Sequence, residues 1–227
     1  MLFDRIRKAF ARQPPGDAAV AGGADFAPVA DWARGRGFAF SALPDGFGLE
    51  GRIAGKPCRL ELGRPSRHYI QGGELRGRAE LGIDPDLMMV LLGRSLKDEL
   101  VKQAYAQYTD TLRTSIDAQL PEETRLLAMY EEVGWDSMPR AFWARYALVA
   151  EHRAQGAAWL DGELSRQLME WPQPAPAQDP PFMLMLLRGR AYLRMQHGGQ
   201  GVPTLQHATQ VFRTACENAV RAFPPPG

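Results

Sequence analysis

The sequence predicts an α+β fold, in which an antiparallel β-meander of about five to seven strands is packed on one face by helices, with a further helix at the C-terminal end. Three observations predict it. Residues 37–92 repeatedly alternate apolar and polar side chains, the pattern of strands with one buried and one solvated face. From Ser95 onward the apolar spacing becomes three and four residues, as in amphipathic helices. Short Gly- and Pro-containing turns separate the strands.

Composition narrows the class of protein. The chain has 227 residues, of which 45% are hydrophobic and 23% charged, as in ordinary globular proteins. These values exclude a mainly disordered chain and a disulfide-rich miniprotein. The formal net charge of +1 argues against a nucleic-acid binder, which has a basic excess. We expect an amphipathic segment with a flexible linker at 1–24 and a single α+β domain at 25–227.

The first twelve residues are predicted to form an amphipathic helix. Its apolar side is made by Leu2, Phe3, Ile6, Ala9 and Phe10. The opposite side carries Asp4, Arg5, Arg7, Lys8 and Arg12, a net charge of +3 from four basic residues and one acidic residue. Residues 13–24 are rich in Pro, Ala and Gly, which is typical of a linker. The segment is therefore predicted to dock on an unknown protein partner or on an anionic membrane surface. The alternative is that it folds back on its own domain.

The elements of the first half follow from local signals. A short helix is expected near residue 25, with Pro28 in its first turn. The ranges 49–53, 58–62 and 75–81 alternate apolar with polar or small residues and are predicted strands. Range 87–92 is apolar throughout, which predicts a strand covered on both faces.

The second half is predicted to be mostly helical. Apolar spacing places helices at about 95–116, 121–133, 138–152 and 156–170. Five prolines within 171–181 predict an extended connection. Two strands are expected within 182–196, meeting near Arg188-Gly189-Arg190, and a last helix at about 203–223.

No motif with catalytic, cofactor-binding or metal-binding chemistry is recognisable. The histidines His68, His152, His197 and His207 have no i,i+4 pair that would suggest a zinc site. The glycine-rich segment Gly198-Gly199-Gln200-Gly201 lacks the Lys-Ser/Thr ending of a phosphate-binding loop, and it is predicted to form a turn. We therefore assign no catalytic residue, cofactor or metal ligand, and we favour a protein that is not an enzyme.

Two further groups of residues are candidates for a binding surface. Trp143, Tyr146 and Trp159 could line an apolar ligand pocket between the sheet and the middle helices, although aromatic residues at helical spacing are also what a core requires. The predicted sheet also carries many arginines among glutamates, which favours a solvated face with cross-strand ion pairs over a basic binding face.

The leading functional hypothesis is a non-enzymatic binding or adaptor protein that docks through residues 1–12. The alternatives are a small apolar-ligand carrier or sensor, and an enzyme of unrecognised type. No segment reaches the roughly 18 apolar residues of a membrane span, and no apolar leader is visible, so a cytoplasmic location, with peripheral membrane contact through residues 1–12, is expected.

Two cysteines, Cys58 and Cys216, give no disulfide framework and leave one disulfide open. Only four of the 27 basic residues are lysines, a bias typical of GC-rich bacterial genomes.

Overall fold

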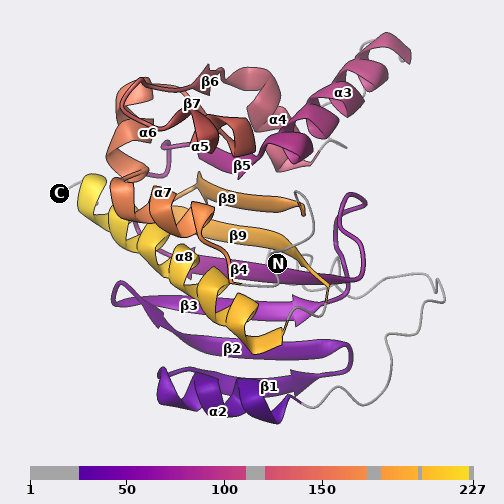
Figure 1. Cartoon of the computed structure of the whole chain (residues 1–227), viewed down its shortest axis with the longest axis vertical. Coiled ribbons are helices and arrows are strands. Elements are labelled where there is room, and N and C mark those ends of the chain that lie inside the picture. The colour runs from indigo at the N-terminus through magenta and orange to yellow at the C-terminus, as the bar shows by residue number, and fades with distance from the viewer. Residues whose placement is uncertain (1–25, 111–120, 173–179, 199–200, 225–227) are drawn as a thin grey trace, which may run out of the picture.

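The computed structural model describes residues 26–110, 121–172, 180–198 and 201–224, and it confirms the α+β class (Figure 1). The helices are α2 (Ala27–Gly35), α3 (Arg94–Asp110), α4 (Glu122–Met129), α5 (Arg140–Arg145), α6 (Arg153–Trp159), α7 (Gly162–Met169) and α8 (Gly201–Ala222). The strands are β1 (Ala39–Leu43), β2 (Gly46–Ile53), β3 (Lys56–Gly63), β4 (Gly73–Glu80), β5 (Met89–Gly93), β6 (Glu132–Val133), β7 (Tyr146–Ala150), β8 (Phe182–Leu187) and β9 (Arg190–His197).

The strands form one antiparallel sheet in the order β1-β2-β3-β4-β9-β8-β5-β7-β6. The first four strands make the predicted meander, and the hairpin β8–β9 joins it to the remaining strands. The turn of that hairpin uses Arg188 at φ 52° and Gly189 at φ 74°, as tight hairpins require. The sheet has nine strands in place of the predicted five to seven, because β6 and β7 lie in segments that the sequence predicts as helix.

One face of the sheet is apolar across seven strands; α8 covers its central part, and α6 packs against β7 through Gly156 and Leu148. A single register row joins Leu49, Leu60, Gly77, Leu193, Leu184, Leu91 and Leu148. Figure 1 shows α8 lying diagonally across this face. A Cβ added at Gly77 would lie 3.1 Å from Cε1 of Phe212 on α8. The missing side chain at Gly77 therefore lets the Phe212 ring approach the centre of the sheet.

The opposite face has two halves. On β2, β3 and β4 it is charged, as the alternation predicts, and Arg59 pairs there with Glu50 and Glu61. On β9 this face is still polar, since Arg190 and Arg194 pair there with Glu80 and Glu74 of β4. From β8 onward the same face is apolar, and Leu96 and Leu100 of α3 and Leu126 of α4 cover it. Helices thus cover both faces of β5, as its unbroken apolar run predicts, and also both faces of β7 and β8, where the sequence predicts a single covered face for the sheet.

The helix predicted at 138–152 is wrong in its second half. α5 ends at Arg145 and residues Tyr146–Ala150 form β7, fully buried between β5 and β6. The side chain of Arg94 donates to the carbonyl oxygens of Trp143 and Tyr146 at 2.7 and 3.0 Å, which satisfies the end of α5. A short apolar run is compatible with helix or strand by periodicity alone, and pairing with β5 decides for the strand.

Two further predicted helices end early. The helix predicted at 121–133 stops at Met129, since Tyr130 is extended and Glu132–Val133 pair with β7. The helix predicted at 156–170 is two helices, α6 and α7. Asp161 separates them, because its carboxylate accepts a hydrogen bond from the amide of Leu164 at 2.8 Å and so begins α7.

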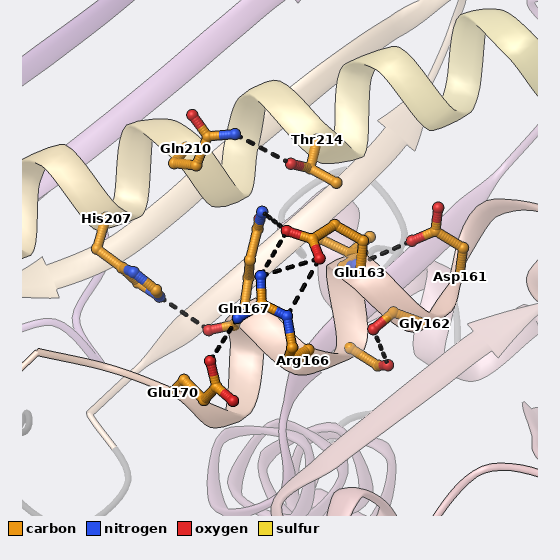
Figure 2. A network of polar contacts seen from close by, with 11 residues as sticks. Asp161, Gly162, Glu163, Arg166, Gln167, Glu170, His207, Gln210 and Thr214 are labelled. Atoms are coloured by element: carbon orange, nitrogen blue, oxygen red, sulfur yellow. Dashed lines mark hydrogen bonds and ion pairs between the residues drawn. The ribbon is translucent and has the colours of Figure 1, made fainter.

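Polar contacts fix α7 against α8 (Figure 2). On α7, Arg166 binds Glu163 at 2.8 Å and Glu170 at 2.6 Å. The ring of His207 on α8 donates to the carbonyl oxygen of Gln167 at 2.8 Å. The same carbonyl accepts a long hydrogen bond from the amide of Glu170 at 3.3 Å, and the contact with His207 ties the end of α7 to α8.

The close approach at Gly77 predicts a stability effect. In Gly77→Ala the new methyl group would lie 3.0 Å from Leu193 Cβ as well as against Phe212, and overpacking of this kind costs about 1–3 kcal/mol. Gly35→Ala is the matched control, because nothing lies within 4 Å of its added Cβ. Urea unfolding should show the loss only for Gly77→Ala, and equal effects of the two substitutions would contradict the packing described.

Candidate functional site

An apolar groove lies at the end of the sheet where α8 begins. We call it the α2–α8 groove; its volume is about 550 Å³. It is lined by Phe26, Val29, Asp45, Phe47, Leu62, Gly63, Gly72, Gly73, His197, Gly198, Gly201, Val202 and Leu205. This volume falls within the range of small-molecule sites, which are mostly apolar with a few polar groups.

The elements that build the groove meet there because antiparallel strands alternate in direction. The start of β2, the end of β3, the start of β4 and the end of β9 share one end of the sheet. α2 supplies one wall through Val29, and the first turn of α8 supplies another through Val202 and Leu205. Gly73 is one of the lining positions; a Cβ there would lie 2.7 Å from the carbonyl oxygen of His197 and 3.5 Å from Cδ1 of Leu62, so its absence leaves room at this wall.

His197 is a buried polar side chain of the groove lining. Its side chain is 8% exposed and lies at the end of β9. Its Nε2 atom is buried and has no hydrogen-bond partner within the described part of the chain. Burial lowers the pKa of His197 below its usual value, so the ring is neutral at pH 7. A buried polar atom without a partner costs about 1–3 kcal/mol, and a ligand group that bonded to it would remove that cost.

The aromatic residues predicted to line a pocket belong to the core. Trp159 is fully buried and its indole donates to the carbonyl of Ala215 at 2.9 Å. The Tyr146 hydroxyl donates to the carbonyl of Leu168 at 2.7 Å, and Trp143 packs at the edge of the core. The cavity beside Tyr146 measures about 20 Å³, which is room for a single water molecule.

The residues predicted to dock on a partner or a membrane lie outside the described residues. They are Leu2, Phe3, Ile6, Phe10, Arg5, Arg7 and Lys8. The groove itself was missed by sequence reasoning, because its lining comes from segments far apart in the chain. The one local signal is the set of lining glycines Gly72, Gly73, Gly198 and Gly201, whose sequence context predicts only turns.

A second cluster of ionisable groups is buried on the opposite face, under α4. Glu123 is 1% exposed, and its carboxylate accepts hydrogen bonds from Arg67 at 2.5 Å and from the Tyr69 hydroxyl at 2.8 Å. Nearby, fully buried Glu74 pairs with Arg194. Burial acts to raise the pKa of Glu123, but the hydrogen bonds and charge of Arg67 outweigh it and hold the pKa below its usual value. Each of the two buried carboxylates is paired, so this cluster fastens the β3–β4 loop to α4 and to β9.

The remaining features to consider in the described ranges are the two cysteines, clusters of metal-binding side chains and membrane-spanning helices. Cys58 and Cys216 are free and buried, and burial raises the pKa of the Cys58 thiol to about 11. Nowhere in these ranges do three His, Cys, Asp or Glu side chains gather in a way that could hold a metal ion. None of the described helices is both long enough and apolar enough to cross a membrane.

The sequence matches no known family model and no curated protein. Among solved structures, the crystal structure of the mycobacterial trehalose monomycolate transport factor A, TtfA, is similar over 87% of this chain and 95% of that chain. The TM-score is 0.49 and the sequence identity 9%. At this identity the likeness concerns the course of the backbone and not the chemistry of any site.

The buried ion pair predicts a large, pH-dependent loss of stability. Arg67→Met leaves the buried Glu123 carboxylate without its cation, which costs about 3–5 kcal/mol. Because the folded pKa of Glu123 is depressed, its contribution is complete above the unfolded pKa of about 4.3. It is lost as pH falls through the folded pKa, so the difference between parent and variant should shrink as the pH is lowered below the unfolded value.

The control is Arg59→Met, whose guanidinium is 53% exposed in its pairs with Glu50 and Glu61. Removing an exposed pair costs about 0–1 kcal/mol. Urea unfolding at neutral and acidic pH measures both variants. A loss for Arg67→Met as small as that for Arg59→Met would show that the cluster does not hold the loop.

Proposed function

We propose that this protein is a non-enzymatic binding protein that carries or senses a small ligand in the α2–α8 groove. The ligand has an apolar body and one hydrogen-bonding group. The observation that carries the proposal is an apolar groove of about 550 Å³ that is lined by His197, a residue whose buried Nε2 has no hydrogen-bond partner among the described residues. Together these features match what a small-molecule site needs, namely apolar area for affinity and one polar group for orientation.

The polar group of the ligand follows from the state of His197. A neutral imidazole has one ring nitrogen that donates and one that accepts. A hydroxyl group can meet either, because it both donates and accepts. A medium-chain alcohol such as decan-1-ol therefore represents the proposed ligand chemistry.

The docking role predicted for residues 1–12 stays a second candidate. Its support is the sequence itself: an apolar stripe opposite a net charge of +3. Such a segment binds an anionic surface by apolar contact and charge together. We propose a peripheral, non-enzymatic adaptor role on this basis, with the groove as the site that receives the ligand.

Blocking the groove tests the proposal. Val202 is partly buried at the start of α8 and lines the groove, so Val202→Trp should fill it. We expect the affinity for the fluorescent probe 1-anilinonaphthalene-8-sulfonate to fall by about tenfold or more, a change of 1.4 kcal/mol or more. Decan-1-ol should displace the probe from the parent protein.

Val220→Trp is the matched control, because Val220 is also a partly buried valine on α8, packed on the same core but outside the groove lining. Its probe affinity should stay within about twofold of the parent. Melting temperatures verify that both variants fold. If Val202→Trp binds the probe as tightly as Val220→Trp does, the groove is not the binding site.

A further inference from the structure

We infer that residues 1–12 of this chain occupy the α2–α8 groove when no ligand is bound, so that ligand and segment exclude each other. The inference rests on the proposed function of the groove as a ligand site. It goes further by naming an occupant from the chain itself and by coupling the groove to the docking segment.

The first support is where the described chain begins. Phe26 lines the groove and contacts Phe47 edge-on, with ring centroids 5.3 Å apart. Residues 13–25 therefore join residues 1–12 directly to the groove wall. A thirteen-residue chain without regular secondary structure spans about 20 Å on average, and a helix of twelve residues is about 18 Å long. The segment is thus held at an effective concentration of about millimolar beside the groove.

The second support is the chemistry of the two surfaces. The sequence predicts a helix at residues 1–12 with Leu2, Phe3, Ile6 and Phe10 on one side. The groove presents apolar side chains from α2, β2, β3 and α8. Docking these surfaces on each other removes both from water. An apolar helix face in an apolar groove is a recurrent mode of peptide recognition.

The third support concerns charge. Among the lining residues the one carboxylate is Asp45, and it already pairs with Arg64 at 3.0 Å. The basic side of the segment thus has no free carboxylate to meet in the groove wall and stays in water. Docking in the groove should therefore depend little on salt, whereas docking on an anionic membrane weakens as salt screens the charges.

One consequence joins the two functional candidates. A ligand that enters the groove displaces the segment, and the released segment then exposes its apolar stripe and its basic side. Since the two occupants compete, the apparent affinity for ligand equals the intrinsic affinity multiplied by the fraction of molecules in which the segment does not occupy the groove.

The experiment uses the full chain and changes the apolar stripe. Phe3→Asp combined with Phe10→Asp should release the segment and raise the affinity for 1-anilinonaphthalene-8-sulfonate by about tenfold, at low and at high salt. Ala18→Asp combined with Ala21→Asp adds the same two charges within the linker and should leave the affinity within about twofold. A synthetic peptide of residues 1–12 should compete with the probe for the Phe3→Asp/Phe10→Asp variant.

The outcomes separate the two proposals. Equal probe affinity of the parent and the Phe3→Asp/Phe10→Asp variant, with loss of binding in Val202→Trp, would overturn the inference and leave the proposed function standing. Absence of probe binding in every variant would contradict the proposed function. In that case the methyl resonances of Leu62 and Val202 are compared between the parent and the Phe3→Asp/Phe10→Asp variant. A difference in their chemical shifts supports docking of the segment in the groove, and identical shifts overturn the inference. A dimeric parent that becomes monomeric in this variant would overturn it too, because the groove would then hold a second copy.

Discussion

The packing of α8 across the sheet at Gly77 is the contact on which the rest of the structure depends. The register row from Leu49 to Leu148 is continuous, and at its centre the missing side chain admits Phe212. This contact sets the height of α8 above the strands. α8 in turn positions Trp159 and α7 through hydrogen bonds to Ala215 and from His207. Its first turn forms a wall of the groove.

The two faces of the sheet serve different purposes. Beneath α3 and α4 the face is closed by apolar packing and by the buried pair of Arg67 and Glu123. On the α8 side the helix covers the centre of the sheet, and the groove stays between its first turn and α2. Gly73 leaves the groove wall without a side chain at the start of β4. His197, whose Nε2 has no partner among the described residues, is a buried polar residue of the lining.

Much of the sheet could be predicted from the sequence, because alternation directly reports which face of a strand is dry. Strand β5 and the hairpin at Arg188-Gly189 were also predicted, from an unbroken apolar run and from turn chemistry. β7 could not be, since Tyr146–Ala150 is apolar in either secondary structure and only its pairing with β5 distinguishes them. The groove was beyond local patterns, because Val29, Leu62 and Val202 meet only in the fold.

The most direct test of this account is a titration of the full chain with decan-1-ol, followed through the methyl resonances of its valines and leucines. The account predicts saturable shifts at Val29, Leu62, Val202 and Leu205, which line the groove, and no comparable shift at Val220. Shifts centred elsewhere, or none at saturating alcohol, would contradict the claim that the α2–α8 groove is the ligand site.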